Sequence, residues 1–371
     1  MTSIELPASS SGRWAGPVGL APCARIGLVS LSLWIVGPAV ISNGAQAQPF
    51  VPTTGEVVPR DVREIYDRGL QYLGATQQED GSWKGNGYGG PGVTGMALMV
   101  FLASGEDPNF GLYSNHVRRA LRNIISGQDA STGIIGQSMY EHGFAMLSLA
   151  EAYGAVDDRS LWTGAESNRR SIGAALELAV RGAITSQKQN PLGAWRYSPD
   201  SRDADTSVSG AVLVGLLAAR NAGIEIPDEV IDRAVKYYVS MTSESGQVAY
   251  AGGFGGFDDS PARIAIGTLV YSVARRKDLP QFKAALKRLI SQIDSPAQNF
   301  YLEYAQYYQA QALFQGDVAA WDKWNKLLTR QLKASQLQDG SFRSQFGPIV
   351  GTSLSMLALA LNYKFLPIYE R

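Results

Sequence analysis

Residues 77–83 read Gln-Gln-Glu-Asp-Gly-Ser-Trp, a glycine turn with an aromatic residue two positions later, and this pattern decides the fold. An amphipathic stretch over 62–73 precedes the turn, and an apolar stretch over 92–103 follows it. Glycine is expected where a helix ends and the chain takes a positive φ. The glutamine amide carries both a donor and an acceptor, so it can bridge the turn to a helix end. The segment therefore predicts one helical hairpin.

The same order of features recurs along the chain, always with a turn between an amphipathic stretch and an apolar one. The units are roughly 45–60 residues long, a period typical of helical-hairpin arrays. Six units are predicted in all. The clearest further copies have Gln187 before Gly193 and Trp195, and Gln336 before Gly340 and Phe342; weaker copies have Gln128 before Gly133, Ser245-Gly246 before Val248, and Pro296 before Phe300.

Two kinds of helix are expected to alternate. Stretches such as 62–73 and 230–239 carry their charged residues on one face, whereas 351–361 is apolar nearly all round. Because a helix that is apolar on every side must be buried, the second helices should form an inner ring and the first helices an outer one. No polar capping repeat stands at either end, as an open solenoid would need. The sequence thus predicts an all-α, closed, double-ringed barrel of six hairpins without a sheet.

The N-terminal residues follow a different pattern. Arg13 and Arg25 precede an apolar run over 26–41, which is followed by Ala-Gln-Ala at 45–47. This is typical of a secretory signal peptide, and the run is shorter than the ~20 residues of a membrane-spanning helix. We therefore expect an exported protein, periplasmic or extracellular, with no membrane span in its mature chain; an uncleaved N-terminal anchor is the alternative. The expected divisions are 1–47 signal peptide, 48–61 linker, 62–366 toroid and 367–371 C-terminal tail.

Composition excludes several classes of function. Cys23, in the leader, is the single cysteine, which excludes a cysteine nucleophile, a thiolate metal site and an iron–sulfur cluster from the mature chain. The 33 basic and 33 acidic residues balance, so nothing electrostatic favours nucleic acid as a partner. With two histidines in the chain, a zinc site is not expected either. We predict no metal and no cofactor.

Arg68-Gly69, Tyr72-Leu73, Gln77 and Gly81-Ser82-Trp83 together resemble the QW repeat of the squalene cyclase and prenyltransferase superfamily. The resemblance covers residues 62–366 and implies an α₆/α₆ toroid with a central cavity, in which the QW turns are stabilising staples. The prenyltransferase branch uses a cysteine on zinc, which this mature chain lacks.

The resemblance also implies a candidate acid. Squalene cyclases protonate an alkene with an aspartate in an Asp-x-Asp-Asp-Thr motif, and the matching stretch here begins Asp203-Ala204-Asp205. Asp205 falls at the proton donor and Asp203 at the first acid, whereas Thr206 replaces the third acid. Cyclases of this class place the active site between two helical domains, and one is predicted here. The residues themselves favour Asp205 as the N-cap of a helix that begins at Thr206.

Other candidate site residues are expected at the mouth of the ring. Tyr140, Glu141 and His142 open the second inner helix, where a histidine beside a glutamate could act as an acid–base pair or simply bond to the helix start. Aromatic residues beside carboxylates are typical of a sugar or polymer site, and equally of a protein-docking rim. The loop candidates of this kind are Trp195, Arg196, Tyr197, Asp258 and Asp259.

Three functions follow from these patterns. The main prediction is an exported, non-cyclising toroid of the cell envelope that binds an apolar small molecule, a glycan or an envelope protein. The first alternative is a terpenoid cyclase-like enzyme with Asp205 as general acid. The second is a polysaccharide-active enzyme that uses Asp203 with Asp205, or Asp258 with Asp259, as acid and base. The lumen distinguishes them, because a ring filled by inner-helix side chains leaves no room for either reaction.

Overall fold

The computed structural model describes residues 58–85, 89–162, 169–252, 256–295 and 301–369. In these residues the secondary structure consists of twelve α-helices and short 3-10 turns, with no strand. The outer helices are α1 (Arg60–Thr76), α3 (Ser114–Ser126), α5 (Ile172–Gln189), α7 (Asp228–Ser240), α9 (Pro280–Ser291) and α11 (Val318–Ser335). The inner helices are α2 (Pro91–Leu102), α4 (Met139–Ala152), α6 (Thr206–Asn221), α8 (Pro261–Val273), α10 (Leu302–Gly316) and α12 (Pro348–Leu359).

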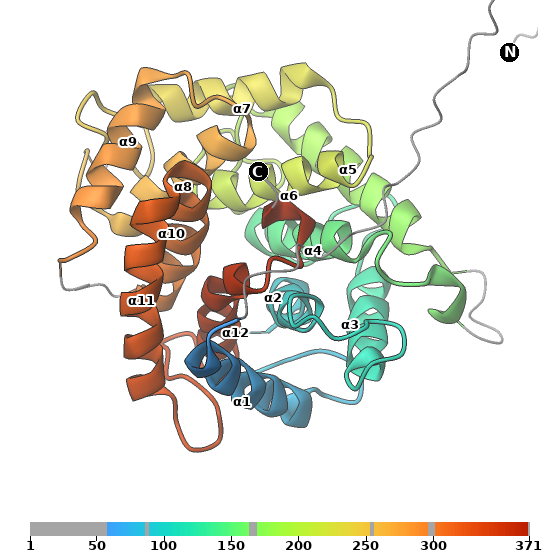
Figure 1. Ribbon diagram of the computed structural model, residues 1–371. Helices are drawn as coiled ribbons and strands as arrows, with labels where there is room; N and C mark the ends of the chain where they lie inside the picture. Colours follow the sequence, from blue (N-terminus) through green and yellow to red (C-terminus); the bar gives the residue numbers. More distant parts are fainter. Residues whose placement is uncertain (1–57, 86–88, 163–168, 253–255, 296–300, 370–371) are drawn as a thin grey trace, which may run out of the picture. The chain divides into compact units, whose positions relative to one another are not determined.

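The inner helices form a closed ring. Each packs against the next along the chain, and α12 packs against α2. The outer helices surround this ring, and the last of them, α11, contacts the first, α1 (Figure 1). The predicted all-α, α₆/α₆ toroid of six helical hairpins is therefore confirmed.

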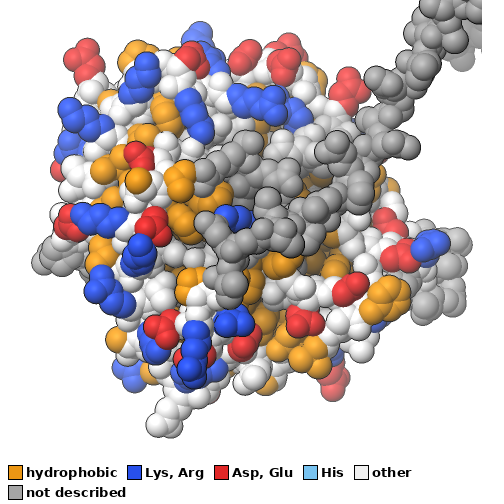
Figure 2. Space-filling view, in the orientation of Figure 1, with side chains coloured by type: hydrophobic (Ala, Val, Ile, Leu, Met, Phe, Trp, Pro, Cys, Tyr) orange, Lys and Arg blue, Asp and Glu red, His pale blue; other side chains and the backbone are white. Residues whose placement is uncertain are grey.

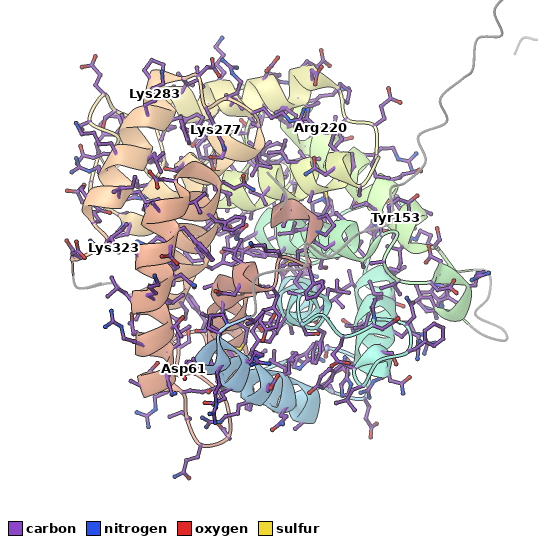
Figure 3. The ribbon with its side chains drawn as sticks, viewed as in Figure 1. Asp61, Tyr153, Arg220, Lys277, Lys283 and Lys323 are labelled. Carbon is purple, nitrogen blue, oxygen red and sulfur yellow. The ribbon has the colours of Figure 1, made fainter. Side chains whose placement is uncertain are left out.

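Burial separates the two rings as the residue patterns predict. In α1 the buried residues Val62, Ile65, Leu70 and Leu73 follow helical spacing along one face. In the inner helix α12 every residue from Ile349 to Leu359 is buried. Charged side chains such as Lys283 and Lys323 stand on the outer helices α9 and α11 at the edge of the view in Figure 3. Acidic and basic side chains are interspersed over the face shown in Figure 2, in keeping with the balanced charge.

Glutamine side chains join successive outer helices at the turns. The Gln77 amide Nε2 donates to the carbonyl oxygen of Gly81, 3.0 Å away, and to that of His116 on α3, also 3.0 Å away. Gln128 and Gln187 make the same pair of bonds to their own turn and to the next outer helix. Gln336 donates to Gly340 and to Ile65 on α1, so the same contact links the last hairpin to the first.

The inner helices approach one another closely where glycines face each other. A Cβ atom on Gly143 of α4 would lie 2.7 Å from the backbone of Ala211 on α6. A Cβ on Gly215 of α6 would lie 2.8 Å from the carbonyl oxygen of Gly143. Any larger residue at these positions would push α4 and α6 apart, so the small residues set the spacing of the ring.

The last described residues form a short 3-10 turn, Pro367–Tyr369, that packs against α6. Its Ile368 is buried, and its backbone N–H donates to the carboxylate of Glu151 on α4 at 3.4 Å. Part of the predicted tail over 367–371 is thus packed against the helices. The predicted signal peptide and most of the linker, residues 1–57, lie outside the described residues, as does the turn at Pro296–Phe300. Across the described part, no helix is both long and apolar enough to span a membrane.

Candidate functional site at the loop end of the ring

The loops that enter the inner helices gather at one end of the ring. The backbone N–H of Met139, at the start of α4, donates to the Tyr197 carbonyl oxygen at 2.8 Å. The N–H of Thr206, at the start of α6, donates to the Tyr250 carbonyl oxygen at 2.9 Å. The Tyr301 ring stacks on Phe346 with 5.7 Å between centroids, which joins the loops before α10 and α12. We call this surface the loop face; it comprises residues 136–138, 196–205, 249–252, 256–260, 301 and 343–347.

Asp205 is the N-cap of α6, as its position in the sequence predicts. Its Oδ1 accepts a hydrogen bond from the Val208 N–H at 2.8 Å, and the side chain is fully buried. The second oxygen, Oδ2, has no hydrogen-bond partner and lies 3.6 Å from Nε of Arg196. Burial raises the pKa of Asp205 to about 6, against the lowering effects of the Val208 N–H and of Arg196.

Arg196 connects the two candidate acids. One of its terminal nitrogens bonds Oδ2 of Asp203 at 2.7 Å, while Nε faces Asp205. Its guanidinium also lies over the Tyr250 ring, 5.7 Å from the centroid. Asp203 is exposed, whereas Asp205 is sealed beneath this arginine. The pair therefore offers solvent one accessible carboxylate, already neutralised, and one that solvent does not reach.

Aromatic side chains fill the lumen at the level of α4 and α10, which stand opposite each other in the order of the inner ring. The Phe144 ring of α4 contacts Tyr307 of α10, with centroids 6.0 Å apart, and Tyr140 contacts Tyr304 at 6.2 Å. Tyr308 packs edge-on against both Tyr304 and Tyr307. Side chains from opposite helices meet, so the centre of the ring is packed at this level.

A polar cavity of about 760 Å³ opens beside the loop face instead. It lies between the turn before α4, helix α5 and the loop before α6. Hydroxyl, amide and carboxylate groups provide most of its polar lining, an arrangement that suits a ligand rich in hydroxyl groups. These side chains are Ser131, Thr132, Gln137, Thr185, Gln189 and Asp200.

Three large aromatic side chains on the loop face are exposed. Tyr197, Phe257 and Tyr301 are 51%, 49% and 55% accessible, and they precede α6, α8 and α10 respectively. Tyr197 belongs to the same loop as Asp200 in the cavity wall, and its hydroxyl lies 3.2 Å from that of Tyr250. Exposed rings on successive loops provide flat surfaces on which a ligand can stack.

The structure places several other candidate residues in structural contacts. Trp195 is buried, and its indole Nε1 donates to the Ala183 carbonyl at 2.9 Å, so the ring is not available for stacking. His142 is buried as well: its Nδ1 accepts from the Ile135 N–H at 3.0 Å and its Nε2 lies 3.1 Å from the Ala179 carbonyl oxygen. Burial lowers the pKa of His142 to about 4, so the ring is neutral.

The remaining candidates, Glu141, Asp258 and Asp259, each contact a different partner. The Glu141 carboxylate accepts a hydrogen bond from the Gln137 N–H at 2.6 Å, at the start of α4. It bonds to this turn rather than to His142. Asp258 pairs with Arg263 at the start of α8, whereas Asp259 pairs with Arg288 of α9. Each of these two neighbouring acids therefore has its own arginine.

The sequence patterns missed Tyr250, Tyr304 and the cavity beside Tyr197. Tyr250 joins the site through the loop before α8, and no spacing in the chain indicates that contact. The sequence predicts an inner helix that contains Tyr304, Tyr307 and Tyr308. Which of these side chains contact α4 depends on how the ring closes. In the described ranges, no group of three or more His, Cys, Asp or Glu side chains is placed to hold a metal ion.

Comparison with known proteins supports the fold. No protein-family model matches the chain, and no curated protein matches it. Among solved structures, a GH76 α-1,6-mannanase of Salegentibacter sp. bound to α-1,6-mannotriose superposes with a TM-score of 0.60 and 12% identity, covering 83% of this chain and 100% of that one. The type II terpene cyclase MstE from Scytonema superposes with a TM-score of 0.57 and 14% identity, covering 82% and 99%. Both show the α/α toroid fold of this chain.

Proposed function

We propose that this chain is a non-cyclising toroid of the cell envelope that binds an extended glycan on its loop face. The observation that carries the proposal is that Tyr197, Phe257 and Tyr301 are exposed at the entrances to three successive inner helices, and that Tyr197 shares a loop with Asp200 of the cavity wall. Sugars stack their apolar faces on aromatic rings and bond through their hydroxyls to side chains such as Gln137 and Asp200. The mannanase in complex with mannotriose supports a glycan as the class of ligand.

The filled lumen and the paired acids support binding rather than turnover. Phe144 and Tyr307 meet across the ring, which leaves no deep pocket at that level for an isoprenoid chain. Asp203 is neutralised by Arg196, and Asp205 is beneath the surface. A general acid must reach the atom that it protonates.

The test is isothermal titration calorimetry of the purified chain with a panel of oligosaccharides that includes α-1,6-mannotriose. Tyr197→Ala and Phe257→Ala should each weaken binding roughly tenfold, because each removes a stacking surface. Phe110→Ala is the matched control, since Phe110 is 89% exposed but follows α2 at the other end of that helix. Failure of every glycan to bind, or an equal loss in Phe110→Ala, would overturn the proposal.

A second candidate, proton-initiated cyclisation of an isoprenoid, is favoured by one observation. Asp205 has a pKa raised to about 6 and an unpartnered Oδ2, properties that suit a carboxylic acid donor. Incubation with squalene and with geranylgeranyl substrates, followed by mass spectrometry of the extracted lipids, tests it. Cyclic products that disappear in Asp205→Asn would establish this reaction in place of glycan binding.

A further inference from the structure

A second hollow, of about 480 Å³, lies on the outer helix α3, apart from the loop face. Its lining residues are basic or amide and include no carboxylate, although their carbon atoms provide most of its wall. It is formed by Asn115, His116, Arg118, Arg119 and Arg122. The His116 ring is half-buried and stacks on Phe101 with centroids 5.7 Å apart.

The three arginines of the hollow are not neutralised. Arg118 donates to the Asn109 carbonyl at 2.9 Å, and Arg122 donates to the Leu161 carbonyl. Nε of Arg119 is buried without a hydrogen-bond partner. Within the described ranges none of the three forms an ion pair, whereas Arg196, Arg263 and Arg288 all do.

His116 contributes a further unsatisfied nitrogen. Its ring contacts both Phe101 and Tyr113, and its Nδ1 is buried without a hydrogen-bond partner. Its pKa is lowered first by burial and then by the positive charge of Arg119. A dianion between the arginines would remove that second effect.

We propose that this hollow binds an oxyanion of the phosphate or sulfate monoester type. Guanidinium groups present planar pairs of N–H donors that match the oxygens of such groups, and the hollow is lined by three guanidiniums that form no ion pair within the described ranges. Arg118 and Arg122 already bond backbone carbonyls, which fixes their direction before the ligand arrives. The anion can come from a soluble small molecule or from a lipid headgroup.

The chain carries its own reporter for this site. Its two histidines are His116, in the hollow, and His142, buried between backbone partners in the inner ring. In ¹³C-histidine NMR spectra, titration with inorganic phosphate should shift the His116 signal saturably and raise the pKa of His116, while His142 stays unchanged. Flotation with phosphatidic acid vesicles tests the lipid source; binding of either probe through these arginines supports the site.

Variants that remove a positive charge test whether the anion binds at these arginines. Arg119→Gln and Arg122→Gln should each weaken phosphate or vesicle binding roughly tenfold, since each removes charge-assisted hydrogen bonds. Arg181→Gln, an exposed arginine on α5, is the matched control and should bind as the unaltered chain does. Circular dichroism checks that each variant folds. The proposal is overturned if neither probe gives saturable binding, or if Arg119→Gln and Arg122→Gln bind as tightly as Arg181→Gln.

Discussion

The carboxyl group of Asp205 experiences two opposing effects in the folded chain. Its Oδ1 caps α6 through the Val208 N–H, a contact that favours the charged form. Its Oδ2 is buried and lacks a hydrogen-bond partner, and burial favours the neutral form. Because the pKa rises to about 6, burial is the larger effect. Above that pH the fold carries a charge that it stabilises poorly.

Asp205→Asn should therefore stabilise the protein at alkaline pH. The folded pKa of about 6 exceeds the unfolded value, so the carboxyl weakens the fold fully above pH 6 and not at all below its unfolded pKa of ~3.9. Asparagine caps a helix as well as aspartate does and carries no charge. We expect the free energy of unfolding to rise by about 2–3 kcal/mol at pH 8 and to change little at pH 4. Urea denaturation at both pH values measures this.

The control for that prediction is Asp205→Ala. Alanine removes the charge and the cap together, and loss of a cap costs roughly 1 kcal/mol at any pH. Its free energy of unfolding should therefore lie below that of Asp205→Asn at pH 4 and at pH 8 alike. If Asp205→Asn were destabilising at pH 8, burial would not be the main influence on this carboxyl.

At the same scale, the sequence predicts some residues of the site and not others. The N-cap role of Asp205 depends on its immediate neighbours, so it can be inferred from the chain. The ring of Tyr250 over Arg196 comes from the next repeat and depends on how hairpins pack. Trp195 is part of a turn motif, and its burial follows from the staple role that the motif predicts.

Among the elements, the glycine turns do the most to define the hairpins. Gly81 has a φ of +82°, and a Cβ there would lie 2.2 Å from the Arg119 carbonyl oxygen on the next outer helix. Gly340 repeats this against the carbonyl of Arg68, 2.2 Å away. The turns thus let the backbone of one hairpin touch the next. Local spacing reveals them, which is why the apolar helices predicted over 92–103 and 351–361 agree with α2 and α12 to within a few residues.

Gly81→Ala should destabilise the protein more than Gly154→Ala. Gly154 has nearly the same φ, +84°, but a Cβ there meets nothing within 4 Å. The alanine at 154 should therefore cost roughly 1–2 kcal/mol for the left-handed backbone alone. At 81 the clash with the Arg119 carbonyl should add about 1–3 kcal/mol. Thermal unfolding of both variants measures the difference, and equal losses would show that the turn relaxes away from α3.

For the whole molecule, the sequence predicts that the ring closes, but it does not predict which side chains meet in the lumen. The absence of polar capping repeats indicates a ring, because an open array would expose two apolar ends. By contrast, contact between Phe144 and Tyr307 arises only when α4 and α10 stand opposite each other. The predicted order of six hairpins places these helices opposite each other, but neither helix sequence indicates which of its aromatic side chains meet across the lumen. The proposal of binding rather than catalysis rests on that contact, which only the structure reveals.

Gln336→Ala should weaken the seam between the two ends of the array. Its amide donates at 2.9 Å to both Gly340 and Ile65, and loss of two such bonds costs about 1–3 kcal/mol. In a closed ring, α1 should then exchange its amide hydrogens faster, although it lies at the other end of the chain. Hydrogen exchange measured by mass spectrometry over residues 60–76 tests this. Gln338→Ala, an exposed glutamine in the same turn, should leave α1 protected. Faster exchange confined to 337–347 in Gln336→Ala would mean that α1 is held independently of the last hairpin.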